Sequence, residues 1–112
     1  MIYDFAAKIK GIKSDLVLSK ELFDEKIIQI GKSMKRPLKI HVVMPDDLPI
    51  KELFIKTEVS ISTMPVYQER ELEEAIITFK EYLEKIAVII NGEVSENEAF
   101  FINSKTFGRL YT

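Results

Sequence analysis

The chain offers few side chains that could carry out acid–base or covalent chemistry. Its one histidine, His41, lies shortly before the adjacent carboxylates Asp46 and Asp47. A histidine near a carboxylate can act as a general base, and paired carboxylates can bind a divalent cation. Because Pro45 and Pro49 flank the aspartates, the favoured interpretation is a turn closed by side-chain hydrogen bonds to the backbone. His41 is then a partly exposed strand residue, and whether it forms a site with Asp46 and Asp47 stays open.

The composition excludes several kinds of site. The 112 residues include no cysteine, so a thiolate zinc site, an iron–sulfur cluster, a disulfide scaffold and a thiol nucleophile are ruled out. With a single histidine, no nucleophile, base and orienting group can be assembled into a catalytic set. The sequence therefore predicts no catalytic residue, no metal and no cofactor. It favours a non-enzymatic protein, with a carboxylate-only or metal-dependent enzyme left open.

Two charged clusters could contact a partner. The basic cluster places four cations within eight residues, and it could bind an anion or a nucleic acid; it comprises Lys32, Lys35, Arg36 and Lys39. The same charges also complement the C-terminal dipole of a helix, which is the simpler interpretation. An acidic cluster at 69–74 could form a docking surface, but glutamates are also favoured at the start of a helix.

The C-terminal segment alternates aromatic residues with arginine. Such alternation on a strand suits base stacking, and tyrosine and arginine are also enriched at protein interfaces. Residues 105–111 partly resemble the RNP1 octamer of RNA-recognition motifs at Lys105, Phe107, Gly108 and Leu110, and depart from it at Thr106 and Arg109. That resemblance implies nucleic-acid binding through a strand face. The interface candidates of this segment are Phe100, Phe101, Phe107, Arg109 and Tyr111.

The overall charge and hydropathy limit the partners. Sixteen basic and eighteen acidic residues give a net charge of −2, which argues against a general nucleic-acid binder and a polybasic membrane anchor. The longest apolar runs, such as 86–90, are far shorter than the roughly 20 residues of a membrane-spanning helix. The N-terminus lacks the pattern of a signal peptide. We therefore expect a cytoplasmic protein without a membrane partner.

Two segments have the apolar spacing of a helix. The first, 20–35, has Ser19 as its expected N-cap, with Leu18 stapled to Phe23, and it ends before Pro37. The second begins near the glutamates that follow Pro65, ends near 91–92, and has an apolar stripe of Leu72, Ile76, Phe79, Leu83, Ile86 and Ile90. Such a stripe either covers a sheet or forms a seam between two copies, and covering is favoured.

The remaining segments read as strands. Residues 2–12 fit both a strand and a helix, and a strand is favoured. Residues 38–44 and 50–63 alternate as an antiparallel hairpin with unequal arms, so the longer arm must also pair elsewhere. The tail, 99–112, is either one interrupted strand or a small hairpin.

The resulting element order is strand, helix, strand, strand, helix, strand. This order predicts a single domain, 1–112, with an α+β fold: a ferredoxin-like split β-α-β (β-α-β-β-α-β), its antiparallel sheet covered by two helices. The fold hosts many unrelated functions, so function has to be argued from the surface.

The sequence favours a small protein-interaction or regulatory module that self-associates, as a homodimer or other homo-oligomer, through the aromatic C-terminal strand or the second helix. The basis is a surplus of large side chains that are hard to place in one core: Tyr3, Phe54, Phe100, Phe101, Phe107 and Tyr111. The first alternative is a single-stranded nucleic-acid-binding protein. The second is a small-ligand sensor or a metal-dependent enzyme.

Overall fold

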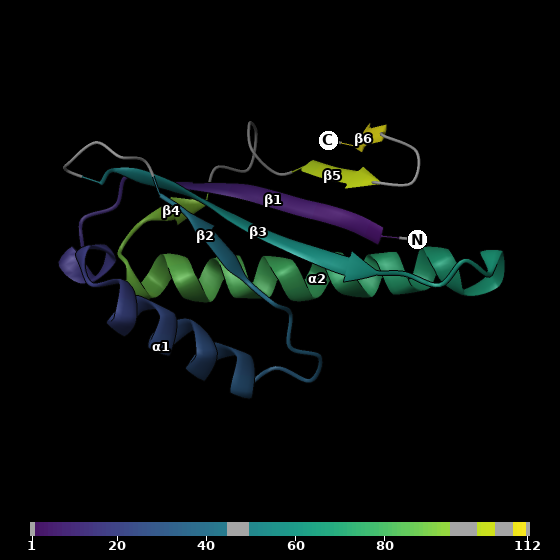
Figure 1. Ribbon diagram of the computed structural model, residues 1–112, viewed down its shortest axis with the longest axis horizontal. Helices are drawn as coiled ribbons and strands as arrows, with labels where there is room; N and C mark the ends of the chain where they lie inside the picture. The colour runs from purple at the N-terminus through teal and green to yellow at the C-terminus, as the bar shows by residue number, and fades with distance from the viewer. Residues whose placement is uncertain (1, 45–49, 95–100, 105–108, 112) are drawn as a thin grey trace.

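A computed structural model describes residues 2–44, 50–94, 101–104 and 109–111. Within these ranges the chain has an α+β fold, in which α-helices pack on an antiparallel sheet (Figure 1). The elements in chain order are β1 (Ile2–Lys10), a short 3-10 helix η1 (Asp15–Leu18), α1 (Lys20–Lys32), β2 (His41–Val43), β3 (Glu52–Ser60), α2 (Pro65–Ile89), β4 (Glu93–Val94), β5 (Phe101–Ser104) and β6 (Arg109–Tyr111).

β1 and β3 form the centre of the sheet, whose strand order is β2-β3-β1-β5-β6. The two strands pair antiparallel along their whole length, from Ile2 opposite Ser60 to Lys10 opposite Glu52. The other edge of β1 is shared, because β4 pairs near its end and β5 pairs near its beginning. Residues 2–10 are therefore a strand, as favoured. The tail contains a hairpin, since β5 pairs antiparallel with β6.

Both α-helices lie on the same side of the sheet, and α2 runs beneath it along the long axis of the molecule (Figure 1). The alternation predicted from the sequence holds on that side, where Leu53, Ile55 and Thr57 of β3 are buried. The β1 residues facing the helices are also buried, including Tyr3, so the prediction that Tyr3 belongs to a surplus of aromatic residues outside the core is wrong. The Phe5 ring packs on Phe79 of α2, with ring centroids 5.7 Å apart.

The apolar stripe of α2 is used within the domain. Phe79, Leu83, Ile86 and Ile90 are buried in the core, and Leu72 and Ile76 pack against it. The covering role is thus confirmed.

Each helix differs at one end from its predicted extent. α1 ends at Lys32 instead of residue 35, and the side chain of the following Ser33 donates a hydrogen bond to the carbonyl oxygen of Ile30 in the last turn. α2 begins earlier than predicted, with Pro65 in its first turn, where the missing N–H costs nothing. The glutamates at 69–74 therefore occupy later turns.

Ser19 is confirmed as the N-cap residue of α1, although its side chain makes no capping hydrogen bond. Leu18 is exposed while Phe23 is buried, so the predicted staple between them does not bury Leu18. β4 was missed altogether, because two residues are too few to show a period.

Among the described residues, none of the helices is both long enough and apolar enough to cross a membrane.

Candidate functional site

β2 is an edge strand of the sheet. Its register places His41 opposite Lys56, Val42 opposite Ile55 and Val43 opposite Phe54. Within the described ranges no strand pairs with its other side. The outer edge of β2 therefore presents backbone donors and acceptors that the sheet itself does not use.

Two buried hydroxyls position the segment that leads into β2. Thr57 Oγ1 donates a hydrogen bond to the carbonyl oxygen of Lys39 at 2.7 Å. The backbone N–H of Leu38 donates to Tyr82 Oη at 3.0 Å, which ties this segment to α2. These two hydrogen bonds hold Leu38 and Lys39, which lie between α1 and β2, against the core side of the sheet.

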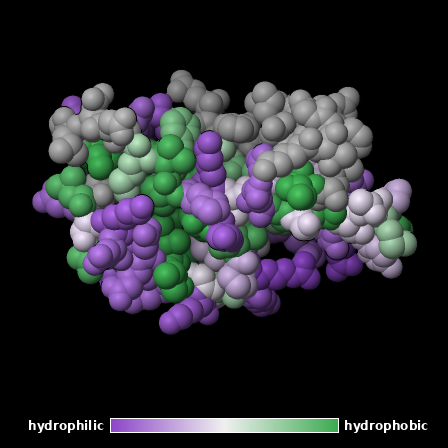
Figure 2. Space-filling model, viewed as in Figure 1, coloured by the Kyte–Doolittle hydropathy of each residue, from purple (hydrophilic) through white to green (hydrophobic). Residues whose placement is uncertain are grey.

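A groove of about 370 Å³ runs between β2 and α1. Its floor is apolar, because Ile40, Val42 and Met44 are half-buried and pack against the core with part of each side chain still accessible. Lys20 and Asp24 of α1 line the opposite wall. Figure 2 shows hydrophobic residues gathered in a band where β2 crosses the front of the sheet, with the hydrophilic surface of α1 beside it.

The groove combines the two features that recognise an extended chain. An open strand edge supplies main-chain hydrogen bonds, and alternate apolar side chains supply contacts for every second residue of the added strand. Edge strands of monomers are commonly protected by being very short, or by lysine, proline or a bulge. β2 has only three residues. No lysine or proline occurs from Ile40 to Met44, and Lys39 and Pro45 flank this stretch. We call this surface, lined by Lys20, Asp24, Ile40, His41, Val42 and Met44, the β2 groove.

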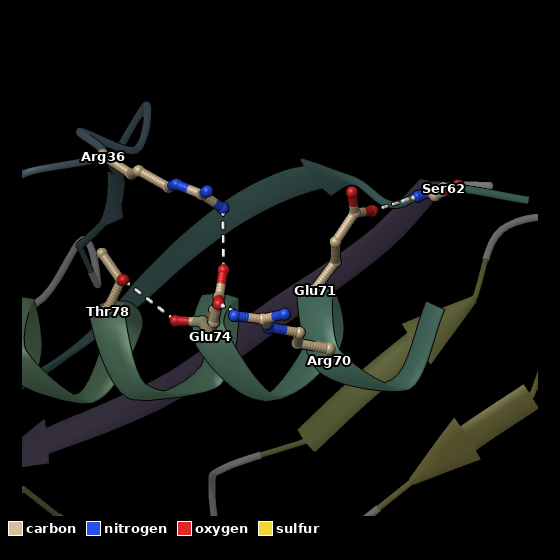
Figure 3. A network of polar contacts seen from close by, with 6 residues as sticks. All are labelled: Arg36, Ser62, Arg70, Glu71, Glu74 and Thr78. Carbon is tan, nitrogen blue, oxygen red and sulfur yellow. Dashed lines mark hydrogen bonds and ion pairs between the residues drawn. The ribbon is translucent and has the colours of Figure 1, made fainter. Parts of the chain in front are cut away.

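The basic cluster predicted as an anion site lies elsewhere, around the end of α1. Arg36 forms an ion pair with Glu74 of α2 at 2.8 Å (Figure 3). Glu74 also pairs with Arg70 at 3.5 Å, and its backbone carbonyl accepts a hydrogen bond from Thr78 Oγ1. Arg36, one of the four cations predicted to bind an anion, is therefore already paired with a carboxylate of the same chain.

One other cation of this cluster, Lys35, lines an open groove together with Arg36. The α2 residues that face them across this groove include Glu74 and Glu81. Lys32 and Lys39 are exposed, and no described cluster joins all four cations around one site. The carboxylates of α2 offset much of the charge that a phosphate would need.

The acidic cluster also has structural partners. Glu71 accepts a hydrogen bond from the backbone N–H of Ser62 at 2.6 Å, which joins the end of β3 to α2 (Figure 3). With Glu74 paired to Arg36, two members of the cluster connect elements within the domain.

His41 lies at the rim of a second groove, on the face of the sheet away from the helices. This groove also takes in Lys56, Asp4 and Glu58. The β1–β3 register sets Asp4 directly opposite Glu58, so the carboxylates near His41 come from neighbouring strands. Sequence reasoning missed them because only the strand register brings them together. Among the described residues, no group of three or more histidine, aspartate or glutamate side chains could hold a metal ion.

The remaining predicted site residues follow β2 in the sequence or belong to the C-terminal segment. Asp46, Asp47, Phe100 and Phe107 lie outside the described residues. Phe101 is placed on β5 opposite Ala6. On β6, Arg109 pairs with Ser104 and Tyr111 with Ile102, and the side chains of β5 and β6 are outside what the structure describes.

Comparison with known proteins adds no relative. No protein-family model, no curated protein and no solved structure matches the chain.

Proposed function

We propose that this chain is a non-enzymatic protein-interaction module that binds an extended segment of a partner along the outer edge of β2. The observation that carries the proposal is the β2 groove: an edge strand whose half-buried apolar side chains face a helix across an open channel. A strand laid in this groove would extend the antiparallel sheet and complete the cover over Ile40, Val42 and Met44.

The groove is also suited to binding because its parts are already in place. Thr57 and Tyr82 hold the chain just before β2, so little order has to be gained on association. Lys20 and Asp24 lie on the opposite wall, where charged residues set the orientation of a partner more than its affinity.

The two surfaces predicted from the sequence for self-association are less well supported as binding sites than the β2 groove. The α2 stripe is buried, and the outward apolar residues of that helix fall into two sets. Val66 and Tyr67 are adjacent at its start, next to the exposed Met64, whereas Ile77 and Val88 lie singly farther along. Single apolar residues are ordinary at a protein surface. The aromatic C-terminal segment stays a prediction, as do a cytoplasmic location and a regulatory role.

We also propose the ferredoxin-like assignment for the core of the fold. It is supported by the positions of β1 and β2, which flank β3 and both run antiparallel to it, with α1 connecting them. That is the split β-α-β connection. β5 and β6 then extend the sheet beyond β1.

Nucleic-acid binding is the weaker alternative. Two of its four candidate cations, Lys35 and Arg36, share a groove with Glu74 and Glu81, and Arg36 is already paired with Glu74. If this alternative is right, the protein should bind labelled single-stranded RNA or DNA, and the affinity should fall steeply as the salt concentration rises.

Selection from a displayed random-peptide library tests the proposal. We expect enriched peptides with alternating apolar residues whose affinity falls by about tenfold or more in Val42→Lys, because a lysine on the groove floor opposes strand addition. Val43→Lys is the matched control, since Val43 is on the same strand but on the other face. Thermal melts establish that both variants are folded. Failure to enrich any peptide, or equal affinity of the two variants, would overturn the proposal.

A further inference from the structure

We propose that Asn91 is a site of spontaneous deamidation, which the fold keeps slow and which unfolding accelerates. Asn91 lies at the C-terminal end of α2, and Gly92 follows it directly before β4. The proposal does not depend on the β2 groove. It is carried by the backbone hydrogen bonds that hold these two residues and by the lack of space around Gly92.

Deamidation of an asparagine begins at the backbone nitrogen of the next residue. Once a base has taken its proton, the nitrogen of Gly92 attacks the side-chain carbonyl carbon Cγ of Asn91. A bond forms between these two atoms, the bond from Cγ to Nδ2 breaks, and ammonia leaves with a proton returned by the base. Water then opens the resulting cyclic imide. Cleavage of the imide nitrogen from Cγ yields aspartate, and cleavage from the main-chain carbonyl carbon yields isoaspartate.

The fold requires the two residue types that react most readily in this way. A glycine obstructs the attack least, because it has no side chain beside the reacting nitrogen. Here glycine is needed for packing, since a Cβ at Gly92 would lie 2.8 Å from Ile9 Cγ2 and 3.2 Å from the carbonyl oxygen of Lys10. Asn91 has a φ of +53°, and asparagine is enriched among the non-glycine residues in this left-handed conformation. The end of α2 therefore brings a reactive pair together for structural reasons.

The native backbone withholds the nitrogen that would react. The N–H of Gly92 donates to the carbonyl oxygen of Ala87 at 2.9 Å, and the N–H of Asn91 donates to that of Val88 at 3.3 Å. These two hydrogen bonds form the Schellman motif that ends α2. Ala87 is buried and Gly92 is half-buried, so a base in solution reaches the Gly92 N–H poorly. The peptide plane of Gly92 also cannot turn towards Asn91 Cγ without breaking its hydrogen bond.

Local opening at the end of α2 should therefore limit the reaction in the native protein. Asn91 itself is exposed, so access of water to this residue is not the barrier. What has to open is the Schellman motif together with β4, which pairs with β1 only at Val94 opposite Ile9 and Glu93 opposite Lys10. Reactions that need such opening proceed in proportion to the open population.

The products do not fit the site that they replace. Both place a carboxylate at the C-terminal end of α2, where the helix dipole disfavours negative charge. Isoaspartate also adds a methylene group to the main chain just before Gly92, which disrupts the spacing of the Schellman hydrogen bonds and of β4. A chain that reacts while unfolded should therefore return to a less stable fold.

Peptide mapping by mass spectrometry tests the proposal. The full chain is incubated in its native state and unfolded in guanidinium chloride, at the same pH and temperature. Conversion of Asn91 should be slower in the native chain by about tenfold or more. In the unfolded chain Asn91 should also react faster than Asn97, which is followed by glutamate. Equal rates at Asn91 in the two states, or an unfolded chain in which Asn91 reacts no faster than Asn97, would overturn the proposal.

The matched control is Asn91→Gly, because glycine accepts the positive φ and has no side-chain amide to lose. After the same incubation in denaturant and refolding, this variant should unfold at the same urea concentration as a fresh sample. The converted native sequence should unfold at a lower urea concentration than its own fresh sample. A converted chain as stable as the unconverted one would contradict the expected misfit of the products.

Discussion

Thr57 Oγ1 and the carbonyl oxygen of Lys39 are 2.7 Å apart, and the hydrogen bond between them joins the buried centre of β3 to the residues that lead into β2. Thr57 is only 2% exposed. Its hydroxyl therefore has to be satisfied inside the protein, and the carbonyl that accepts it lies just before the edge strand. A polar residue in the core thus sets where the sheet edge begins.

Thr57→Val should lower the free energy of unfolding by about 1–3 kcal/mol, because the isosteric valine removes the donor and leaves the Lys39 carbonyl without it. Urea denaturation measures the change. Thr63→Val is the control, since Thr63 is exposed and follows the strand. Equal stability of the two variants would show that the hydrogen bond does not anchor β2.

Tyr82→Phe should also destabilise the fold by about 1–3 kcal/mol, since the backbone N–H of Leu38 loses its acceptor in a part-buried position. Tyr82 is 1% exposed, so water cannot easily replace the hydroxyl. Tyr67→Phe, at an exposed position of α2, should leave the thermal melting temperature unchanged. A Tyr82→Phe melt that matches the native one would contradict the assigned contact.

Gly92→Ala should be more damaging than Gly11→Ala. A Cβ at Gly92 would lie 2.8 Å from Ile9 Cγ2 and 3.2 Å from the Lys10 carbonyl oxygen, so β4 could not stay against β1. Overpacking of this kind costs about 1–3 kcal/mol or more.

At Gly11 a Cβ meets nothing within 4 Å, but the φ of +66° strains an alanine by roughly 1–2 kcal/mol. Denaturant unfolding of the two alanine variants gives the comparison. The reverse ranking would show that β4 is not packed as described.

Arg36→Ala should change stability by less than about 1 kcal/mol, because the ion pair with Glu74 joins exposed side chains. The difference from the native protein should shrink further in high salt. Parallel unfolding curves at low and high salt measure both effects. A loss as large as that of Tyr82→Phe would show that this surface network contributes more than its exposure allows.

Much of the framework could be predicted from alternation and helical spacing. The strand favoured at residues 2–12 is β1, and the unequal hairpin correctly required a second partner for the longer arm. These predictions succeed because a single period determines which side chains are buried.

The β2 groove could not be predicted in the same way. The groove exists because α1 leaves part of the sheet uncovered and because β2 is the edge strand. Both features depend on packing between segments that are distant in sequence. The placing of Asp4 opposite Glu58 likewise depends on strand register. The aromatic C-terminal segment was predicted as an interface because its composition is unusual. The floor of the groove consists of ordinary aliphatic residues, whose composition gives no such signal.

Amide hydrogen exchange along β2 tests the central claim most directly, because a bound extended segment would form hydrogen bonds with the outer edge of this strand, which no described strand uses. The exchange rates at His41, Val42 and Val43 are compared with and without a peptide enriched in the library selection. Saturating peptide should slow exchange at β2 and leave it unchanged at Thr63, an exposed residue that follows β3. If exchange at β2 is the same with and without peptide, extended segments do not bind at this edge.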